Sequence, residues 1–347
     1  MTADAVRKQF LNQAKGCDYL GSPLTARVLR LLGAAMTEDM PVGAVVLNWT
    51  GDLSRMGDAL ALRLAGGLHG LVLAARDSGL AALYADPAGH DDAAATDILL
   101  ATLQTHAPTL LQVLQSPPQT NEVRRSVALI AAAQHLAARF GLPFTLSEMG
   151  TSAGLNLMFD RYGMVVNGIH FGPANPVLTL TPDWQGPLPP QGPVVVAGRA
   201  GVDINPLDAI ADRLRILSYI WADQPDRLAR TEAALDLAAA ERPALHRGDA
   251  ADWLETRLAM PHQGTLHLVF HTILWSYLSA ASRDRIIALL EDAGARATPF
   301  APLAHVAMEN DAINDGVVLT LRLWPPGQTA VLGRVDVHGR WVRWQAD

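Results

Sequence analysis

The chain has 347 residues, half of them hydrophobic, and a formal net charge of -7 at neutral pH. Such a chain can bury one large core or two of ordinary size. Its acidic balance disfavours a protein that coats nucleic acid or a membrane surface, because those partners favour clustered positive charge. The single cysteine, Cys17, excludes an intramolecular disulfide framework and a thiolate zinc site.

The first half of the chain has a helical pattern. Leu60, Leu64, Leu68 and Leu71 recur on one face of a predicted helix. Pro and Gly breaks at 21–23, 87–89 and 117–118 divide this half into several helices. The last of these is predicted to start near Thr120, a possible N-cap, and to end near 141–143. We therefore predict an all-helical N-terminal cap region over residues 1–120.

From residue 121 onward, short β-rich runs alternate with helical segments, as in a mostly parallel sheet with helices on both faces. We expect an α/β, Rossmann-like domain over 121–347 with an insert at 163–193 that is rich in Pro, Gly and Trp. The predicted strands are 144–148, 194–202, 244–246, 266–271 and 304–308. The predicted helices are 208–221, 226–241, 250–258 and 282–292. A C-terminal antiparallel hairpin, 317–323 with 329–337, closes the predicted sheet.

The segment 144–156 carries the clearest functional signal. It combines an apolar strand, an acidic residue at the strand end (Glu148), a turn of small residues, and a helix start. Gly150 and Gly154 can adopt positive φ, and free N–H groups at a helix start attract polar or anionic groups. Since open α/β sheets bind ligands at the carboxyl ends of their strands, the segment predicts a nucleotide or nucleoside site. A turn of this kind can also serve packing alone.

Three further polar segments follow predicted strands, so all of them are expected to converge on one sheet edge. They are Asp203, then Gly248-Asp249-Ala250, then the run from His271 through Trp275 to Tyr277. This order resembles class I S-adenosylmethionine-dependent methyltransferases over roughly residues 125–340. The resemblance implies a methyltransferase-type sheet, S-adenosylmethionine as cofactor and a small-molecule acceptor.

By that resemblance, the loop after the first strand approaches the methionine part of the cofactor, Asp203 takes the ribose hydroxyls, and Asp249 with Ala250 meets the adenine. The expected cofactor-binding residues are Glu148, Gly150, Ser152, Gly154, Asn156, Asp203, Asp249 and Ala250. His271 and Tyr277 are expected to act on the acceptor as catalytic residues, with methyl transfer needing mainly in-line positioning and a base.

Each assignment has a structural alternative. Asp203 could shape a turn, Asp249 could cap the next helix, and His271 could be a hydrogen-bonded histidine at a strand end. Trp275 could be a packing residue. The chain also departs from the methyltransferase pattern, because the loop has only two glycines and its distance to Asp203 exceeds that of an ordinary βαβ unit.

A second resemblance covers nearly the whole chain. Gly-Thr-Ser-Ala-Gly-Leu-Asn at 150–156, Asp-Arg-Tyr at 160–162, Gln-Thr-Asn-Glu at 119–122, Gly-Asp-Ala at 248–250 and Val-Phe-His-Thr at 269–272 look like the bacterial family catalogued as domain of unknown function 2332. This resemblance adds Asn121, Glu122 and Arg161 to Trp275 as candidate substrate-binding residues. An ordinary surface ion pair between Arg161 and Glu122 is the alternative.

Two rival functions remain open. The Gly-x-Ser-x-Gly turn at 150–154 matches a serine-hydrolase nucleophile elbow, with Ser152 as nucleophile and Asp249 with His271 or His305 as partners. Glu148 beside the nucleophile and the long helical half argue against it. The third hypothesis is a non-catalytic scaffold that binds a nucleoside-type ligand or a protein partner.

The remaining expectations are negative or general. His267 and His271 have a metal-site spacing, but they lie on a predicted strand without a third ligand, so we expect no metal site. We expect no binding to a membrane or to bulk nucleic acid, and no membrane-spanning helix. We expect a cytoplasmic location, because residues 1–21 lack the apolar core of a secretion signal. The sequence does not indicate the oligomeric state.

Overall fold

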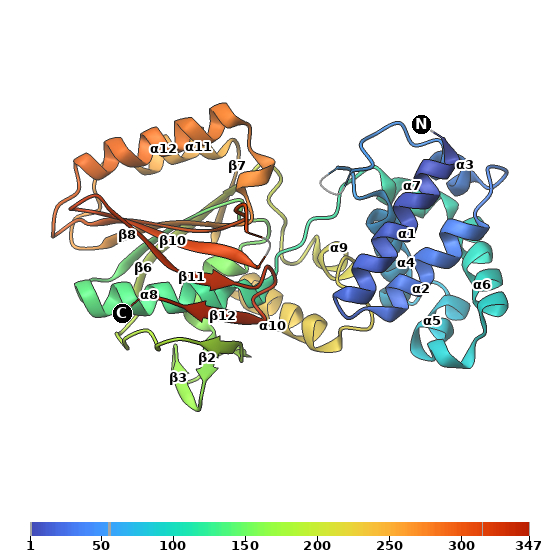
Figure 1. The fold of residues 1–347 in the computed structure, drawn as a ribbon, viewed down its shortest axis with the longest axis horizontal. Coiled ribbons are helices and arrows are strands. Elements are labelled where there is room, and N and C mark those ends of the chain that lie inside the picture. The colour runs from blue at the N-terminus through green and yellow to red at the C-terminus, as the bar shows by residue number, and fades with distance from the viewer. Residues whose placement is uncertain (1, 55–56, 314, 347) are drawn as a thin grey trace. The chain divides into compact units, whose positions relative to one another are not determined.

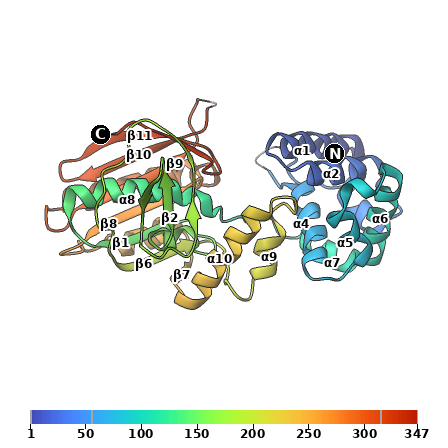
Figure 2. The same ribbon diagram turned by 90° about the horizontal axis from the view of Figure 1, so that it is seen from below.

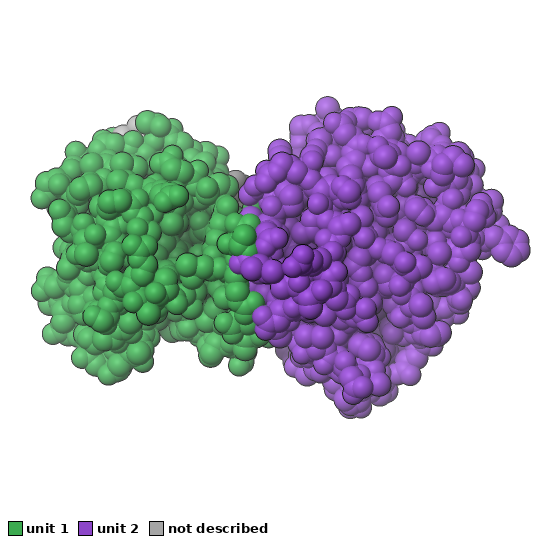
Figure 3. All heavy atoms as spheres, turned by 180° about the vertical axis from the view of Figure 1, so that it is seen from behind, with its two compact units in different colours: residues 1–120, 211–232 green, residues 121–210, 233–347 purple. Residues whose placement is uncertain are grey.

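The computed structural model describes residues 2–54, 57–313 and 315–346. The chain forms two compact units (Figure 3): a helical unit made of Met1–Thr120 with Ala211–Glu232, and a sheet unit made of Asn121–Ile210 with Ala233–Asp347. Among the described residues, no helix has both the length and the apolar character required to cross a membrane.

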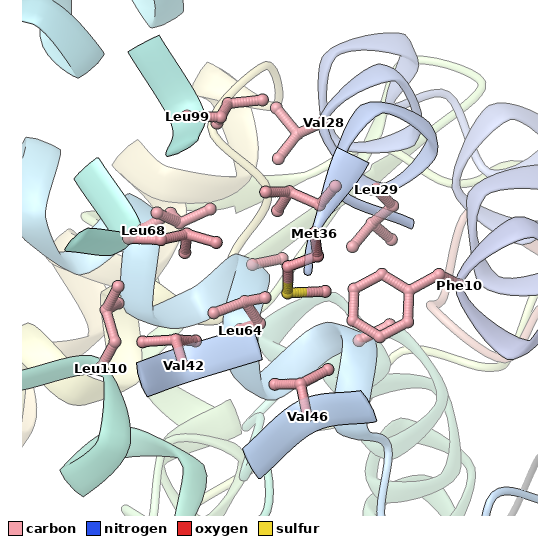
Figure 4. Close-up of a cluster of buried hydrophobic side chains, with 14 of the residues drawn as sticks. Phe10, Val28, Leu29, Met36, Val42, Val46, Leu64, Leu68, Leu99 and Leu110 are labelled. Carbon is pink, nitrogen blue, oxygen red and sulfur yellow. The ribbon is translucent and has the colours of Figure 1, made fainter. Parts of the chain in front are cut away.

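The helical unit packs its helices around α4, most of whose residues are buried. Its elements are α1 (Ala3–Tyr19), α2 (Pro23–Ala35), α3 (Pro41–Leu47), α4 (Leu60–Leu73), α5 (Ser78–Ala85), the short 3-10 helix η1 (Pro87–Gly89), α6 (Asp92–Thr105), α7 (Ala107–Leu114) and α9 (Arg213–Ser218). The predicted leucine stripe is confirmed as core: Leu64 and Leu68 lie in the apolar cluster that includes Phe10 and Met36 (Figure 4). Gly66 lets α9 approach α4, because an added Cβ there would lie 2.5 Å from the ring of Tyr219.

The sheet unit has nine strands in the order β5-β12-β11-β10-β9-β8-β1-β6-β7 (Figure 1). The strands are β1 (Phe144–Met149), β5 (Asp183–Gln185), β6 (Val196–Asp203), β7 (Ala244–Arg247), β8 (Leu266–Thr272), β9 (Leu303–Glu309), β10 (Val317–Trp324), β11 (Gln328–Val335) and β12 (Trp341–Trp344). Strands β7, β6, β1, β8 and β9 are parallel, and β10 to β12 form an antiparallel meander. The predicted α/β fold, with a mostly parallel sheet and a C-terminal hairpin, is confirmed.

Helices cover both faces of this sheet (Figures 1 and 2). On one face, α11 (Ala250–Arg257) and α12 (Ala280–Ala295) pack on an apolar layer that includes Met149 and Val269. On the other face lies α8 (Ser126–Phe140). The helix α10 (Pro225–Glu241) contributes residues to both units.

Several predicted elements differ in extent. The helix predicted from Thr120 begins at Ser126, because the Glu122 side chain accepts from the Arg124 N–H and starts a 3-10 turn, η2 (Val123–Arg125). That helix does end at Gly141, whose φ is 60°. The helix predicted over 208–221 is shortened to α9.

The connection from β1 to β6 also differs from expectation. The helix predicted to start after the turn is not an α-helix but a six-residue 3-10 helix, η3 (Asn156–Arg161). The predicted insert then forms a separate three-stranded sheet of β2 (Gly163–Val166), β3 (Ile169–Phe171) and β4 (Thr179–Leu180). The edge strand β5 and its neighbour β12 were not predicted.

The strand order defines where this sheet can bind a ligand. From β1 the chain continues to β6 and β7 on one side, and later to β8 and β9 on the other. The order therefore reverses between β1 and β8. In open α/β sheets, the crevice at the carboxyl ends of the strands flanking such a reversal is the usual ligand site.

Candidate functional site

The loop after β1 is held in an unusual backbone conformation. Gly150, Ser152 and Gly154 have φ values of 69°, 52° and 74°, which confirms the expected positive φ at both glycines. A Cβ added at Gly150 would lie 2.8 Å from Leu274 Cδ1, and one at Gly154 would lie 2.9 Å from Leu245 Cδ2. The glycines therefore allow both the turn and its close packing on neighbouring segments.

Asp203, at the end of β6, ties two turns together. Its Oδ2 accepts a hydrogen bond from the Ser152 N–H at 2.9 Å, and its Oδ1 accepts one from the Asn205 N–H at 2.8 Å. The side chain is half-buried. Asp203 thus has the turn-shaping role considered from the sequence, and it also lies one hydrogen bond from the glycine loop. Each carboxylate oxygen can accept a further hydrogen bond.

Glu148 is almost completely buried, with 2% of its surface exposed, at the end of β1. Its Oε2 accepts a hydrogen bond from Thr151 Oγ1 at 2.6 Å. Burial disfavours the charged form and raises the pKa of Glu148 to about 8. At neutral pH this side chain is mainly protonated, so the argument that its negative charge opposes an oxyanion at Ser152 loses force.

Two buried asparagines support the loop from beneath. Asn121 Oδ1 accepts from the Leu155 N–H at 2.9 Å, and Asn156 Oδ1 accepts from Ser126 Oγ at 2.9 Å. Glu122 is also buried and caps η2. These three predicted site residues lie together around the loop, and each accepts a hydrogen bond from another group of the protein.

A second polar cluster follows β8. His271 Nδ1 lies 2.6 Å from Glu309 Oε1. The Trp275 ring stacks on the His271 ring, with the centroids 4.4 Å apart and the planes at 6°. His305 lies 5.1 Å away, centroid to centroid. Within the described part of the chain, His271 Nε2, His305 Nε2 and Glu309 Oε2 are buried without a hydrogen-bond partner.

The two groups of residues lie on opposite faces of the sheet. Glu148 is paired with Phe270 in the β1–β8 register, and the next residue, His271, therefore points to the other face. In the β8–β9 register, His271 is paired with Ala307. Glu309 is two residues after Ala307, so it lies on the same face as His271. The candidate site consequently has a loop side, around Ser152 and Asp203, and a histidine side, around His271.

The remaining predicted residues of the strand ends lie on the segments that follow β7 and β8, and the Gly248 N–H donates to the Asp203 carbonyl at 3.0 Å. Asp249 caps α11, since its Oδ1 accepts from the N–H groups of Ala251 and Asp252 at 2.8 and 3.2 Å, and Ala250 is the first residue of that helix. Tyr277, in the short 3-10 helix η4 (Trp275–Tyr277), is 71% exposed.

Arg161 is a surface residue. It forms an ion pair with Glu241 at 3.0 Å and lies 3.7 Å from Asp160, whereas Glu122, the partner considered as an alternative, is buried. This arrangement leaves Arg161 as an ion-paired residue on the outside of the sheet unit.

A pocket of about 430 Å³ lies beside the glycine loop. Its walls include Ala153 from the loop, Leu207 from the segment after β6, and Arg242 with Leu245 at the start of β7. The Leu207 N–H donates to the Ser152 carbonyl at 3.1 Å, which fixes one wall to the loop. A ligand in this pocket can reach the loop from the β6 side.

Sequence reasoning missed Glu309. It follows the predicted strand 304–308 directly, so the rule applied to the other strand ends would have found it. Among the residues that the structure describes, no three His, Cys, Asp or Glu side chains are grouped so that they could hold a metal ion.

Comparison with protein families gives a match over nearly the whole chain. The model of a family described as "Uncharacterized protein conserved in bacteria (DUF2332)" matches residues 7–344. No curated protein and no solved structure matches the chain.

Proposed function

The chain belongs to this family of uncharacterized bacterial proteins, and we propose that it is an S-adenosylmethionine-dependent methyltransferase acting on a small acceptor. The observation that carries the proposal is the position of Asp203. This carboxylate ends the parallel strand next to β1 and is hydrogen-bonded to the glycine loop beside the reversal of strand order. An acidic residue at such a place suits recognition of a ribose diol.

Three observations fit a nucleoside-containing cofactor at this edge. Both oxygens of Asp203 can accept from ribose hydroxyls in addition to their backbone donors. Ser152 Oγ is buried and has no hydrogen-bond partner in the described chain, so it is available to a polar group of the ligand. A Cβ added at Gly248 would meet no atom within 4 Å, which leaves open space at the end of β7.

In this proposal Asp203, Ser152 and the Gly248–Asp249 turn hold the cofactor, and His271 assists the acceptor. The bound cofactor would supply an electrophilic methyl group on a sulfonium. The protein then has to align the acceptor with that methyl group and accept a proton, which are positioning and acid–base tasks.

The geometry does not favour the serine hydrolase. The positive φ of Ser152 is typical of a strained nucleophile elbow. However, Ser152 Oγ and His271 Nε2 are both without a partner among the described residues, so no nucleophile–base hydrogen bond is formed. The carboxylate that contacts His271 belongs to Glu309, whereas Asp249 caps a helix.

Isothermal titration calorimetry with S-adenosylmethionine and S-adenosylhomocysteine tests the proposal. We expect saturable binding that is lost in Asp203→Ala and weakened in Asp203→Asn. Asp292→Ala is the matched control, because this carboxylate is 73% exposed on α12 and should leave binding unchanged.

Absence of binding at millimolar ligand would refute the proposal. An ester-substrate screen against Ser152→Ala would then test the hydrolase. Binding without turnover on any acceptor would instead favour the non-catalytic scaffold.

A further inference from the structure

Glu309 fixes both the ring of His271 and the segment that follows it. Its Oε1 lies 2.6 Å from His271 Nδ1 and accepts the Leu274 N–H at 2.7 Å. Because a carboxylate oxygen accepts, Nδ1 of the neutral ring carries the proton, and the lone pair lies on Nε2. The hydrogen-bond network thus makes Nε2 a proton acceptor.

Nε2 of His271 is buried, and within the described chain it has no hydrogen-bond partner. The side chain is 0% exposed. An unpartnered polar atom in a protein interior is unfavourable and calls for a functional reason. The stacked Trp275 ring fixes the plane of the imidazole, so Nε2 has a defined direction as well as a defined tautomer.

The backbone beside this ring is strained. Ile273, between β8 and η4, has a φ of 55°, which is rare for a β-branched residue. Ser152, which follows β1, has a φ of 52°. Strained non-glycine residues therefore follow both strands that flank the reversal of strand order, and such strain is typical of functional sites.

We propose that Nε2 of His271 takes the proton of a hydroxyl acceptor and that Glu309 is its positioning residue, so that the acceptor class is a hydroxyl compound. This inference rests on the proposed methyl transfer. Nε2 is buried, and Trp275 of η4 stacks on the same ring, so we take η4, whose Tyr277 is 71% exposed, as the side from which the acceptor approaches.

The chemistry explains why a base specifies a hydroxyl. A neutral amine attacks with its lone pair before losing a proton, whereas a hydroxyl oxygen is a weak nucleophile until its proton leaves. The acceptor oxygen bonds to the methyl carbon as the carbon–sulfur bond breaks. The electron pair of the carbon–sulfur bond stays on sulfur, and the hydroxyl proton moves to Nε2.

Nearby groups keep that proton on His271. The carboxylate of Glu309 stabilises the imidazolium that forms. Burial, and then the charge of His271, hold the pKa of His305 well below its usual range, so His305 stays neutral. His305 therefore does not compete for the proton.

Titration with 4-nitrophenol tests the proton transfer without any turnover, because the phenol and the phenolate absorb at different wavelengths. We expect the bound probe to show more phenolate than free probe at the same pH. In Glu309→Gln, the dissociation constant should stay within about twofold while the bound phenolate-to-phenol ratio falls about tenfold, equivalent to one pKa unit of the probe. His271→Gln should abolish the excess phenolate, and His170→Gln, at an exposed position on β3, is the control.

The inference is overturned if the probe does not bind, if it binds without ionising, or if Glu309→Gln leaves the phenolate ratio unchanged. Near-ultraviolet circular dichroism checks that each variant is folded, and Glu309→Asp, which retains the charge, replaces the glutamine variant if that one unfolds. Calorimetry with S-adenosylmethionine on the same samples separates the two claims. Cofactor binding without excess phenolate refutes the base and leaves the methyltransferase, and excess phenolate without cofactor binding refutes methyl transfer and leaves His271 only as a proton acceptor.

Discussion

Replacement of Glu148 by glutamine should stabilise the protein at alkaline pH. The folded-state pKa of Glu148 is raised by burial from 4.5 to about 8. Between these values the folded protein holds a proton that the unfolded chain releases, so stability falls as pH rises. At about 1.4 kcal/mol per pKa unit, the full effect is about 5 kcal/mol above pH 8.

Glutamine mimics the protonated carboxyl group and cannot ionise. It can still accept the hydrogen bond from Thr151 Oγ1, so near pH 5 the variant should differ from the wild type by no more than about 1 kcal/mol. Above pH 8 the variant should be more stable by about 3–5 kcal/mol.

Urea unfolding followed by tryptophan fluorescence, at intervals from pH 5 to pH 9, measures this difference. The matched control is Glu255→Gln, whose side chain is 61% exposed in an ion pair and should change stability by about 0.5 kcal/mol or less at every pH. A difference between Glu148→Gln and the wild type that does not vary with pH would refute the reasoning.

Three further predictions concern packing and acid stability. In urea unfolding, Gly154→Ala should destabilise the protein by about 1–2 kcal/mol more than Gly141→Ala, because both glycines have positive φ but only the Cβ at position 154 would press on Leu245. Equal losses of stability would contradict this. Leu64→Ala, at a core position 1% exposed, should lower the stability of the helical unit by about 2–5 kcal/mol, and a loss below about 1 kcal/mol would mean that the site is loosely packed. Burial holds the pKa of His267 well below 6.5, so its contribution to stability is present above pH 6.5 and is lost as pH falls. His267→Gln should therefore lose less stability than the wild type between pH 7 and pH 5. An equal loss of stability in the two proteins over this range would contradict this.

The central strands were predictable because they are buried on both faces. All six residues of β1 are buried, and the strand appears in the sequence as a short run in which Phe144, Leu146 and Met149 are apolar, bounded by the turn residues Pro143 and Gly150. The edge strand β5 and its neighbour β12 have three and four residues, which is too short for a periodic pattern. The start of α8 was predicted too early because the side chain of Glu122 caps a 3-10 turn, an interaction that a helical pattern does not reveal.

The candidate site was predictable only in part, for a similar reason. Residues at strand ends, such as Asp203 and His271, could be expected at one sheet edge from their position alone. Their partners come from distant segments: Glu309 reaches His271 across 38 positions, and Asn121 reaches the loop across 34. Contacts of this length depend on strand order, which the sequence pattern does not specify uniquely.

The most direct test of the central claim is a crystal structure of the protein grown with S-adenosylhomocysteine. The account predicts density for the ligand at the carboxyl ends of β1 and β6, with the ribose hydroxyls within hydrogen-bond distance of the Asp203 carboxylate. A fully occupied ligand at any other place, or an empty edge in crystals grown at saturating ligand, would contradict it.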